Sequence, residues 1–216
     1  MKDKIIINGN DFYYDREDLS YSHTHAMSHD EAQNILFRAK ELLDSKGLRF
    51  FLAYGTLLGA IREHGFIKGD EDVDIAVDNE EHLISIIPYL EENDLHLIRV
   101  IPGNTYTFRT NEDCYIDMYI LRPIFRFSIW SLYCYALCNL KTPKKYFKEY
   151  DQMEFLGKEF CCPKNPEKLV EFWYGKSWRT PIRGHKFYYE VKTAYYWRMY
   201  IAPFLKKILL FDKWHK

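Results

Sequence analysis

The sequence predicts a protein of the α/β or α+β class, in which helices pack on a small mixed β-sheet. Helix and strand patterns alternate from residue 28 to about residue 122, and the strand patterns are short. Apolar residues make up 47% of the 216 residues, which suffices for one core. We therefore expect a single domain over residues 1–216, with its core at about 28–122 and a helical, aromatic region at about 123–216.

Capping residues and apolar periodicity define the elements in the first part of the core. Ser28 and Glu31 form a capping box at the start of a helix that Gly47 ends. Strict alternation of apolar and acidic residues marks "DVDIAV" as a strand. The expected elements are a helix over 28–47, a strand over 48–54, a short helix from 56 to about 62 and a strand over 72–77.

The second part of the core continues with a helix and three strands. Asp78 with Glu81 opens the helix "NEEHLISIIPYLEEN", which we expect to bend or restart at Pro88. Turn residues separate the three strands that follow, "LHLIRVI", "TYTFRT" and "CYIDMYIL". After Pro123 the sequence predicts aromatic helices and then a loop-rich stretch near "CCPKNPEKL". We expect residues 1–27 to be irregular.

Composition excludes several classes of function. The formal net charge is −1, so a nucleic acid is not expected as the partner. The five cysteines are irregularly spaced and form no CxxC pair, so we expect reduced thiols and no zinc site. The N-terminus lacks a signal-peptide pattern, and no stretch reaches the ~18 uncharged apolar residues of a spanning helix. A cytoplasmic protein is the expectation.

The chemistry is concentrated in an acidic run at the predicted strand 72–77. Asp72 and Asp74 are two residues apart on a strand, so their side chains point to the same face, with Cα atoms ~6.5–7 Å apart. Asp117 stands alone in another apolar strand, where an unpaired carboxylate is costly to bury. Three carboxylates on neighbouring strands would hold a divalent cation, which prefers hard oxygen ligands.

Two alternatives explain acidic runs without such a site. A solvated loop is the first, and it suits Asp70 and Glu71 best. A calcium-binding EF-hand loop is the second, because carboxylates counted from Asp70 fall at several suitable positions. The sixth loop position must be Gly for a sharp turn, and here it is Ile75, a β-branched residue that resists positive φ. We therefore reject the EF-hand.

A turn suited to phosphate binding precedes the acidic run. Gly55 and Thr56 lie between a predicted strand and a predicted helix, where backbone N–H groups and the positive helix end are exposed. Thr56 can cap the helix and offer its hydroxyl, and Arg62 can reach a phosphate from nearly two turns along. A plain helix cap and an ordinary surface cation are the alternatives for these residues.

Taken together, these residues resemble the nucleotidyltransferase superfamily, with its Gly-Ser/Thr turn and Asp-x-Asp strand, and more narrowly the LicD/fukutin-related family. The similarity is strongest over about residues 50–78, in "YGTLLGAIREHGFIKGDEDVDIAV", and extends into "YIDMY" and "FWYGKSWRTP". The family usually carries a Pro-Trp pair where this chain has Lys68 and Gly69, and an Asp where it has Glu71. These departures remove none of the expected ligands.

The resemblance implies a nucleotidyltransferase-type sheet and a metal-dependent transferase. The implied reaction moves a phospho-alcohol group, such as phosphocholine or an alditol phosphate, from a CDP-activated donor to a hydroxyl of a cell-surface glycan. Mg²⁺ or Mn²⁺ is the implied cofactor. Carried over residue by residue, the family pattern implies that Gly55, Thr56 and Arg62 bind the donor. The implied catalytic and metal-binding residues are Asp72, Asp74 and Asp117.

The same resemblance implies the partners and leaves the role of Asp117 open. Asp117 would be a third ligand or the general base of an in-line displacement at phosphorus. The acceptor would be a glycan or a lipid-linked oligosaccharide, as in lipopolysaccharide or capsule biosynthesis. The segment 202–216 has the apolar and lysine pattern of an interfacial helix, which suggests a peripheral contact with the inner face of the membrane, although a core helix fits it too.

Two other functions are compatible with the same motifs. One is a nucleotidyltransferase that moves an NMP group onto a protein or a small molecule. The other is a pseudoenzyme that binds a glycan or a nucleotide without turnover. Three converging carboxylates argue against the pseudoenzyme, because a binding protein has little reason to keep such costly buried charges.

Overall fold

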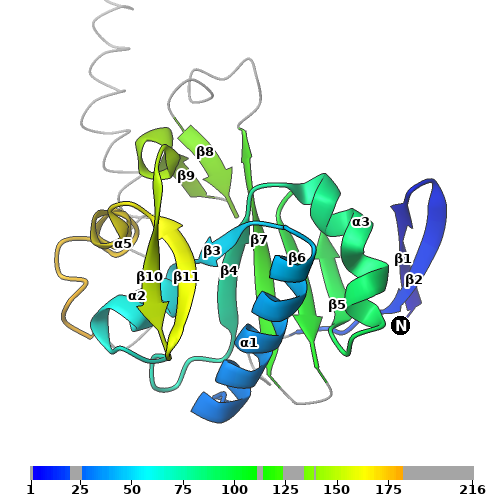
Figure 1. Ribbon diagram of the computed structural model, residues 1–216, viewed down its shortest axis with the longest axis horizontal. Helices are drawn as coiled ribbons and strands as arrows, with labels where there is room; N and C mark the ends of the chain where they lie inside the picture. The colour runs from blue at the N-terminus through cyan, green and yellow to red at the C-terminus, as the bar shows by residue number, and fades with distance from the viewer. Residues whose placement is uncertain (1, 20–25, 111–113, 124–133, 139, 182–216) are drawn as a thin grey trace, which may run out of the picture. The chain divides into compact units, whose positions relative to one another are not determined.

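The computed structural model describes residues 2–19, 26–110, 114–123, 134–138 and 140–181 (Figure 1). The chain divides into two compact units, Met1–Pro166 and Glu167–Lys216. The first unit contains a mixed sheet, hairpins and packed helices, and the second begins within helix α5 (Pro166–Tyr174). The mixed α+β class predicted from the sequence is confirmed.

A seven-stranded mixed sheet forms the centre of the first unit (Figure 1). Its strand order is β3-β4-β7-β6-β5, with β8 paired to β7 and β9 paired to β8. The β4–β7 pair is parallel, and the other neighbouring pairs are antiparallel. The strands are β3 (Phe50–Leu52), β4 (Val73–Val77), β5 (His96–Ile101), β6 (Thr105–Arg109), β7 (Tyr115–Pro123), β8 (Cys134–Leu137) and β9 (Leu140–Pro143).

Two helices, α1 (His29–Ser45) and α3 (Glu80–Glu91), lie side by side over this sheet (Figure 1). The predicted capping box of α1 is confirmed, because Ser28 and Glu31 each accept a backbone N–H of the other. The apolar stripe of α1 is buried, and the helix contacts β4 and β7, while α3 contacts β5. A third helix, α2 (Tyr54–Arg62), follows β3 directly, as the sequence predicted.

Helix α3 differs from the prediction in two details. Its N-cap is Asn79, whose side chain accepts a backbone N–H of the first turn. Asp78 does not cap it, because its carboxylate is bound by Arg49, whose Nε lies 2.9 Å from Asp78 Oδ2. The helix also continues through Pro88, although the proline ring removes one helical N–H, and buried apolar residues on either side hold it against the sheet.

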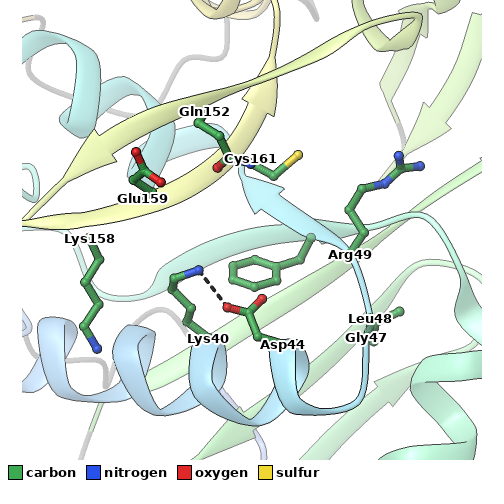
Figure 2. Close-up of a pocket in the computed structure, with 10 residues that line it drawn as sticks. Lys40, Asp44, Gly47, Leu48, Arg49, Gln152, Lys158, Glu159 and Cys161 are labelled. Carbon is green, nitrogen blue, oxygen red and sulfur yellow. Dashed lines mark hydrogen bonds and ion pairs between the residues drawn. The ribbon is translucent and has the colours of Figure 1, made fainter.

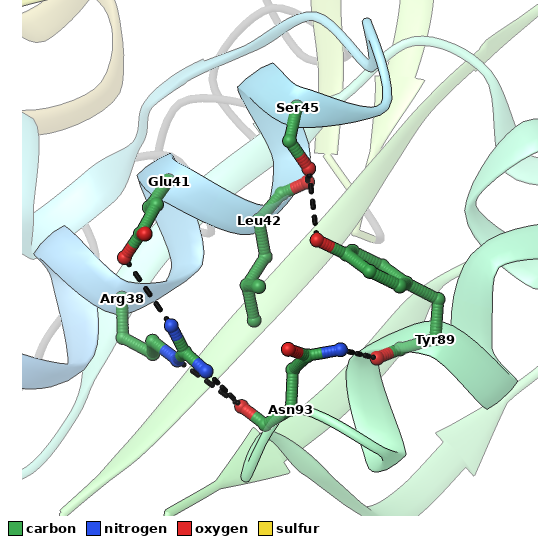
Figure 3. A network of polar contacts seen from close by, with 6 residues as sticks. All are labelled: Arg38, Glu41, Leu42, Ser45, Tyr89 and Asn93. Carbon is green, nitrogen blue, oxygen red and sulfur yellow. Dashed lines mark hydrogen bonds and ion pairs between the residues drawn. The ribbon is translucent and has the colours of Figure 1, made fainter.

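A polar network ties α1 to the turn that follows α3 (Figure 3). Arg38 donates from Nε and Nη2 to the Asn93 carbonyl oxygen, at 3.1 and 2.9 Å. The Ser45 and Tyr89 hydroxyls are 3.1 Å apart, and Asn93 Nδ2 donates to the Tyr89 carbonyl at 2.8 Å. These bonds join the C-terminal halves of the two helices.

Replacing Arg38 with Met is expected to lower the free energy of unfolding by about 1–2 kcal/mol, because the Asn93 carbonyl loses two donors of a charged group. Urea unfolding followed by circular dichroism measures the loss. Glu41→Gln is the matched control, since its contact with Arg38 is an exposed ion pair and should be worth less than about 0.5 kcal/mol. Equal losses in both variants would contradict the assignment of the energy to the Asn93 carbonyl.

The N-terminal residues form a hairpin instead of the irregular segment expected there. β1 (Lys2–Ile7) and β2 (Asn10–Asp15) pair around Asn8 and Gly9, and both turn residues have positive φ. This is the geometry of a two-residue type I′ turn, for which Asn-Gly is the preferred sequence. The expectation of irregular structure over 1–27 is therefore wrong for residues 2–15.

Residues 134–138 and 140–163 also form mainly strands, where aromatic helices and then a loop-rich stretch were expected. After β8 and β9 come a short 3₁₀ helix, η1 (Lys144–Phe147), and a hairpin of β10 (Tyr150–Phe155) and β11 (Lys158–Pro163). Leu156 and Gly157 have positive φ and form another two-residue turn. Along β11, Lys158 and Glu159 are exposed, whereas Phe160, Cys162 and Pro163 are buried, so no strict period of two marks this strand in the sequence.

The second unit is described as far as residue 181. Helix α5 buries Leu169, Val170 and Trp173, and beyond it Arg179 forms an ion pair with Glu167 at 2.5 Å. The expected interfacial helix over 202–216 lies outside the described residues. In the part of the chain that the structure describes, no helix is long and apolar enough to cross a membrane.

Candidate active site

Two central strands bring the predicted carboxylates of distant segments together. Asp74 on β4 is the register partner of Asp117 on the parallel strand β7. On the other side of β7, Asp117 is the register partner of Thr107 on β6. Directly paired residues on neighbouring strands point to the same face of a sheet, so the three side chains form one polar row across its centre. Asp74 is 6% exposed and Asp117 is 3% exposed.

Asp70 joins this row from the loop ahead of β4. A Cβ atom built on Gly55 would lie 2.7 Å from Asp70 Oδ2 and 3.2 Å from Asp74 Oδ2. Both carboxylates therefore pack against the backbone at position 55, where a larger residue would displace them. Asp72, two residues before Asp74, repels it electrostatically, as Asp70 and Asp117 do. We call Asp70, Asp72, Asp74 and Asp117 the carboxylate cluster.

The first turn of α2 is fixed to Asp74 by its backbone and by a side chain. The Gly55 N–H donates to Asp74 Oδ2 at 2.9 Å, and the Asp74 N–H donates to Thr56 Oγ1 at 2.8 Å. Thr56 does not cap the helix as expected, because the N-cap is Ala53, which makes no side-chain cap. The structure thus brings Gly55 and Thr56 to the cluster. Their binding of donor phosphates stays a prediction.

Arg62 occupies the last turn of α2, about 10 Å along the helix axis from Gly55. Its Nε donates to Glu63 Oε1 at 2.6 Å, and its side chain is 12% exposed. The expected contact between Arg62 and a phosphate of the donor also stays a prediction.

Burial and mutual repulsion make two carboxyls of the cluster reluctant to ionise. The pKa of Asp74 is raised well above its usual value, first by desolvation and then by the charges of Asp72, Asp70 and Asp117. The Gly55 N–H opposes this rise. The pKa of Asp72 is raised to about 8, by desolvation and by the same kind of repulsion, and the nearby Arg99 guanidinium opposes it. A cation would relieve both effects.

Asp117 is held by three side chains that the sequence reading did not assign to the site. Arg99 Nη2 lies 3.2 Å from Asp117 Oδ1 and 3.1 Å from Oδ2. Arg99 Nε donates to Thr107 Oγ1 at 3.0 Å, and the Thr107 hydroxyl donates to Asp117 Oδ1. The Tyr119 hydroxyl donates to Asp117 Oδ2 at 3.2 Å. The signal for Tyr119 was its alternation with Asp117 along β7, but no comparable signal marks Thr107 or Arg99, which lie on other strands.

The donor set of Asp72 and Asp74 fits a hard divalent cation. Both offer only carboxylate oxygens, and both have a raised pKa that a positive charge would lower. Among the described residues, no three Asp, Glu, His or Cys side chains are arranged around one ion as they stand. Both Asp117 oxygens accept bonds from other side chains, including Arg99. Asp72 and Asp74 are therefore the pair that could hold a cation, and metal binding by these two residues and by Asp117 stays a prediction.

Mg²⁺ is expected to raise the unfolding temperature, and to raise it more as the pH increases from about 6 to about 9. In the unfolded chain the Asp72 and Asp74 carboxyls lose their protons near their usual pKa, whereas the folded metal-free protein keeps them to higher pH. The metal-free fold therefore loses stability as the pH rises from about 4 to about 8, and a bound cation restores it. Thermal unfolding with Mg²⁺ and with EDTA measures the difference. A Mg²⁺ effect of equal size across this range would contradict it.

A separate hollow of about 800 Å³ lies between the end of α1, the start of β3 and the β10–β11 hairpin (Figure 2). Three of its charged groups have partners: Lys40 pairs with Asp44 at 2.7 Å, and Arg49 binds Asp78. The Lys40 ammonium also lies 5.1 Å from the centre of the Phe160 ring. The hollow is at the opposite end of β3 from Gly55, so it does not belong to the carboxylate cluster.

A mixed sheet that places an Asp-x-Asp strand against a Gly-Thr helix start defines a protein of the nucleotidyltransferase type. The model of the family "LicD/FKTN/FKRP, nucleotidyltransferase domain" matches residues 47–165, more than half of the chain. The chain belongs to this family. The matched segment contains Gly55, the whole carboxylate cluster and Arg99.

Several curated proteins are similar to parts of the chain. "Uncharacterized protein RP689" of Rickettsia prowazekii is 41% identical over 54 residues, which are 24% of this chain and 20% of that protein. "Ribitol-5-phosphate transferase FKTN" of Homo sapiens is 24% identical over 161 residues, which are 70% of this chain and 34% of that protein. The chain therefore spans about a third or less of the length of these relatives.

Two solved structures also align with the chain. The lincomycin-bound lincosamide antibiotic adenylyltransferase LnuA has a TM-score of 0.45 and 13% identity, and the match covers 64% of this chain and 84% of that one. The antibiotic-resistance factor ANT(2'')-Ia has a TM-score of 0.49 and 10% identity, and the match covers 74% of this chain and 78% of that one.

Proposed function

We propose that the protein transfers a phospho-alcohol group from a CDP-activated donor to a hydroxyl group of a glycan, with the aid of Mg²⁺ or Mn²⁺. The observation that carries the proposal is the convergence of the carboxylate cluster on the first turn of α2, within a LicD/FKTN/FKRP domain. The similarity to fukutin, named a ribitol-5-phosphate transferase, favours a phospho-alcohol as the transferred group.

The proposed reaction is an in-line displacement at the phosphorus that carries the alcohol. The glycan oxygen forms a bond to this phosphorus, the bond from phosphorus to the CMP oxygen breaks, and the hydroxyl proton passes to a carboxylate or to water. A divalent cation bound at Asp72 and Asp74 would neutralise charge on the donor phosphates and on the leaving CMP. Catalysis then rests mainly on positioning and electrostatics.

The residues around Asp74 would orient its carboxylate toward the cation. Gly55 N–H holds one Asp74 oxygen and Thr56 holds its backbone, so the carboxylate is fixed before substrate arrives. Asp117 has both oxygens engaged, so it can accept the glycan proton, or ligate the cation, only when one of these bonds is given up. Burial of Asp74 and Asp117 strengthens every charge interaction at the site.

A thermal-unfolding panel tests the proposal. The nucleotides are CDP-choline, CDP-glycerol, CDP-ribitol, CDP-ethanolamine, CTP and ATP, each with Mg²⁺, with Mn²⁺ and with EDTA. We expect one CDP-alcohol to raise the unfolding temperature in a metal-dependent way, because a ligand that binds only the folded state stabilises it. CMP release in the presence of an acceptor glycan then measures turnover.

Two variants make the panel specific. Asp74→Asn should lose the metal-dependent shift, whereas Asp151→Asn, an exposed change on β10, should keep it. A rise in unfolding temperature with CTP or ATP, but with no CDP-alcohol, would contradict the proposal and indicate transfer of an NMP group instead. Binding of a CDP-alcohol without any CMP release from a range of glycans would favour the pseudoenzyme.

A further inference from the structure

A β-bulge determines which residue of β5 faces the carboxylate cluster. Leu97 pairs with Phe108, and the next register pair is Arg99 with Thr107, so Ile98 is an extra residue on β5. With regular pairing Ile98 would stand opposite Thr107 and an apolar side chain would lie beside Asp117. The bulge places Arg99 there instead. Bulges often re-aim a side chain beside an active site.

Arg99, Thr107 and Tyr119 together fill the acceptor positions of the Asp117 carboxylate. A carboxylate has about four acceptor positions. In this structure Oδ1 contacts Arg99 and Thr107, and Oδ2 contacts Arg99 and Tyr119. The Asp117 side chain is 4% exposed and that of Arg99 is 21% exposed, so water cannot readily replace the ion pair. Asp117 is therefore the carboxylate of the cluster to which Arg99 bonds directly, whereas the Arg99 charge acts on Asp72 from a distance.

We propose that Arg99 is a positioning residue that competes with the divalent cation for Asp117, holding this carboxylate only while the cation is absent. The inference rests on the proposed function, because it needs a cation at the neighbouring Asp72 and Asp74. A cation that took Asp117 as a third ligand would need oxygen lone pairs that now face Arg99, Thr107 and Tyr119. It would also lie close to the guanidinium charge, and like charges at such distances repel.

This arrangement has a consequence for cation affinity. Breaking the Arg99–Asp117 pair costs free energy, and this cost is subtracted from the affinity for the cation. The cation should therefore bind less tightly than the same three carboxylates would bind it without Arg99. Replacing Arg99 should therefore recover the lost affinity for the cation, but only in a protein that keeps the Asp117 carboxylate.

Mn²⁺ titration by electron paramagnetic resonance tests the competition without any turnover measurement. Arg99→Met should tighten Mn²⁺ binding about 10-fold, a typical size for such coupling. Arg99→Lys should stay near the wild type, because it keeps a cation beside Asp117. The gain should vanish in the double variant Arg99→Met, Asp117→Asn relative to Asp117→Asn alone. Arg109→Met is the matched control, since it removes a half-buried arginine of the neighbouring strand β6 that is paired with Glu17.

The possible results separate this inference from the proposed function. Mn²⁺ binding by the wild type with no gain in Arg99→Met overturns the competition alone. A gain that persists in full with Asp117→Asn also overturns it, because the effect would then be general charge removal. No Mn²⁺ binding by any variant overturns the competition and the metal-dependent function together. Should Arg99→Met not fold, Arg99→Gln provides the same test with a neutral donor left on Asp117.

Discussion

Asp74→Asn is expected to make the metal-free protein more stable while abolishing transfer. The Asp74 carboxyl is buried among other carboxyls, and its raised pKa means that its ionised form disfavours the folded state. Asn is neutral and similar in shape, and its oxygen can still accept the Gly55 N–H. We expect a gain of about 1–2 kcal/mol in EDTA, or about 2–8 °C in unfolding temperature.

The loss of transfer in the same variant should exceed about 100-fold, since metal neutralisation of charge is worth several kcal/mol in the transition state. Thermal unfolding in EDTA and CMP release measure the two effects. The gain in stability should grow with pH, because the folded pKa of Asp74 is raised and the penalty of its charge appears above the unfolded value. Asp151→Asn should change neither quantity. A less stable Asp74→Asn protein would contradict our account of the cluster.

Gly59→Ala is expected to produce the largest loss of stability among single-methyl changes in α2. A Cβ atom at position 59 would lie 2.5 Å from the Gly65 carbonyl oxygen and 3.2 Å from the Ile67 nitrogen, and both are backbone atoms. The turn at 65–67 would have to move away from the helix. Overpacking of this kind costs about 1–3 kcal/mol or more. The higher helix propensity of Ala offsets ~1 kcal/mol of this cost.

Urea unfolding of Gly59→Ala should show a net loss of about 2 kcal/mol. Gly65→Ala is the matched control on the other side of the same contact. The nearest atom to a Cβ at position 65 is His29 Cε1 at 3.7 Å, an ordinary van der Waals distance, and φ at position 65 is not in the left-handed region. Its free energy of unfolding should stay within about 0.5 kcal/mol of the wild type. A similar loss in both variants would show that the methyl group is not the cause.

The core elements were predictable because their signals are local. The α1 capping box and the alternation in β4 each depend on residues within a few positions of one another, and both are confirmed. The hairpins at Asn8–Gly9 and Leu156–Gly157 were missed for different reasons. Asn-Gly is a strong signal for a two-residue turn, so the first hairpin was predictable, whereas Leu-Gly is a weak signal, because a leucine with positive φ is uncommon.

The site was predictable only in part. Asp74 and Asp117 could be chosen from strand alternation, and the structure places them in register. Asp70 was assigned to a solvated loop, since its approach to Gly55 depends on how α2 and β4 pack. Arg99 could not be found, because its position depends on a bulge that no residue pattern in β5 reveals.

The parallel pairing of β4 and β7 also has a consequence for the order of folding. Strands β5, β6 and β7 follow one another in the sequence and pair as antiparallel neighbours, so their contacts close short loops. The β4–β7 pair closes a loop of more than forty residues that includes α3, β5 and β6. We expect the three-strand meander to form early and β4 to dock late. The ion pair between Asp117 and Arg99 would then form before β4 docks. The carboxylates that repel Asp117 would therefore approach a residue whose charge is already paired.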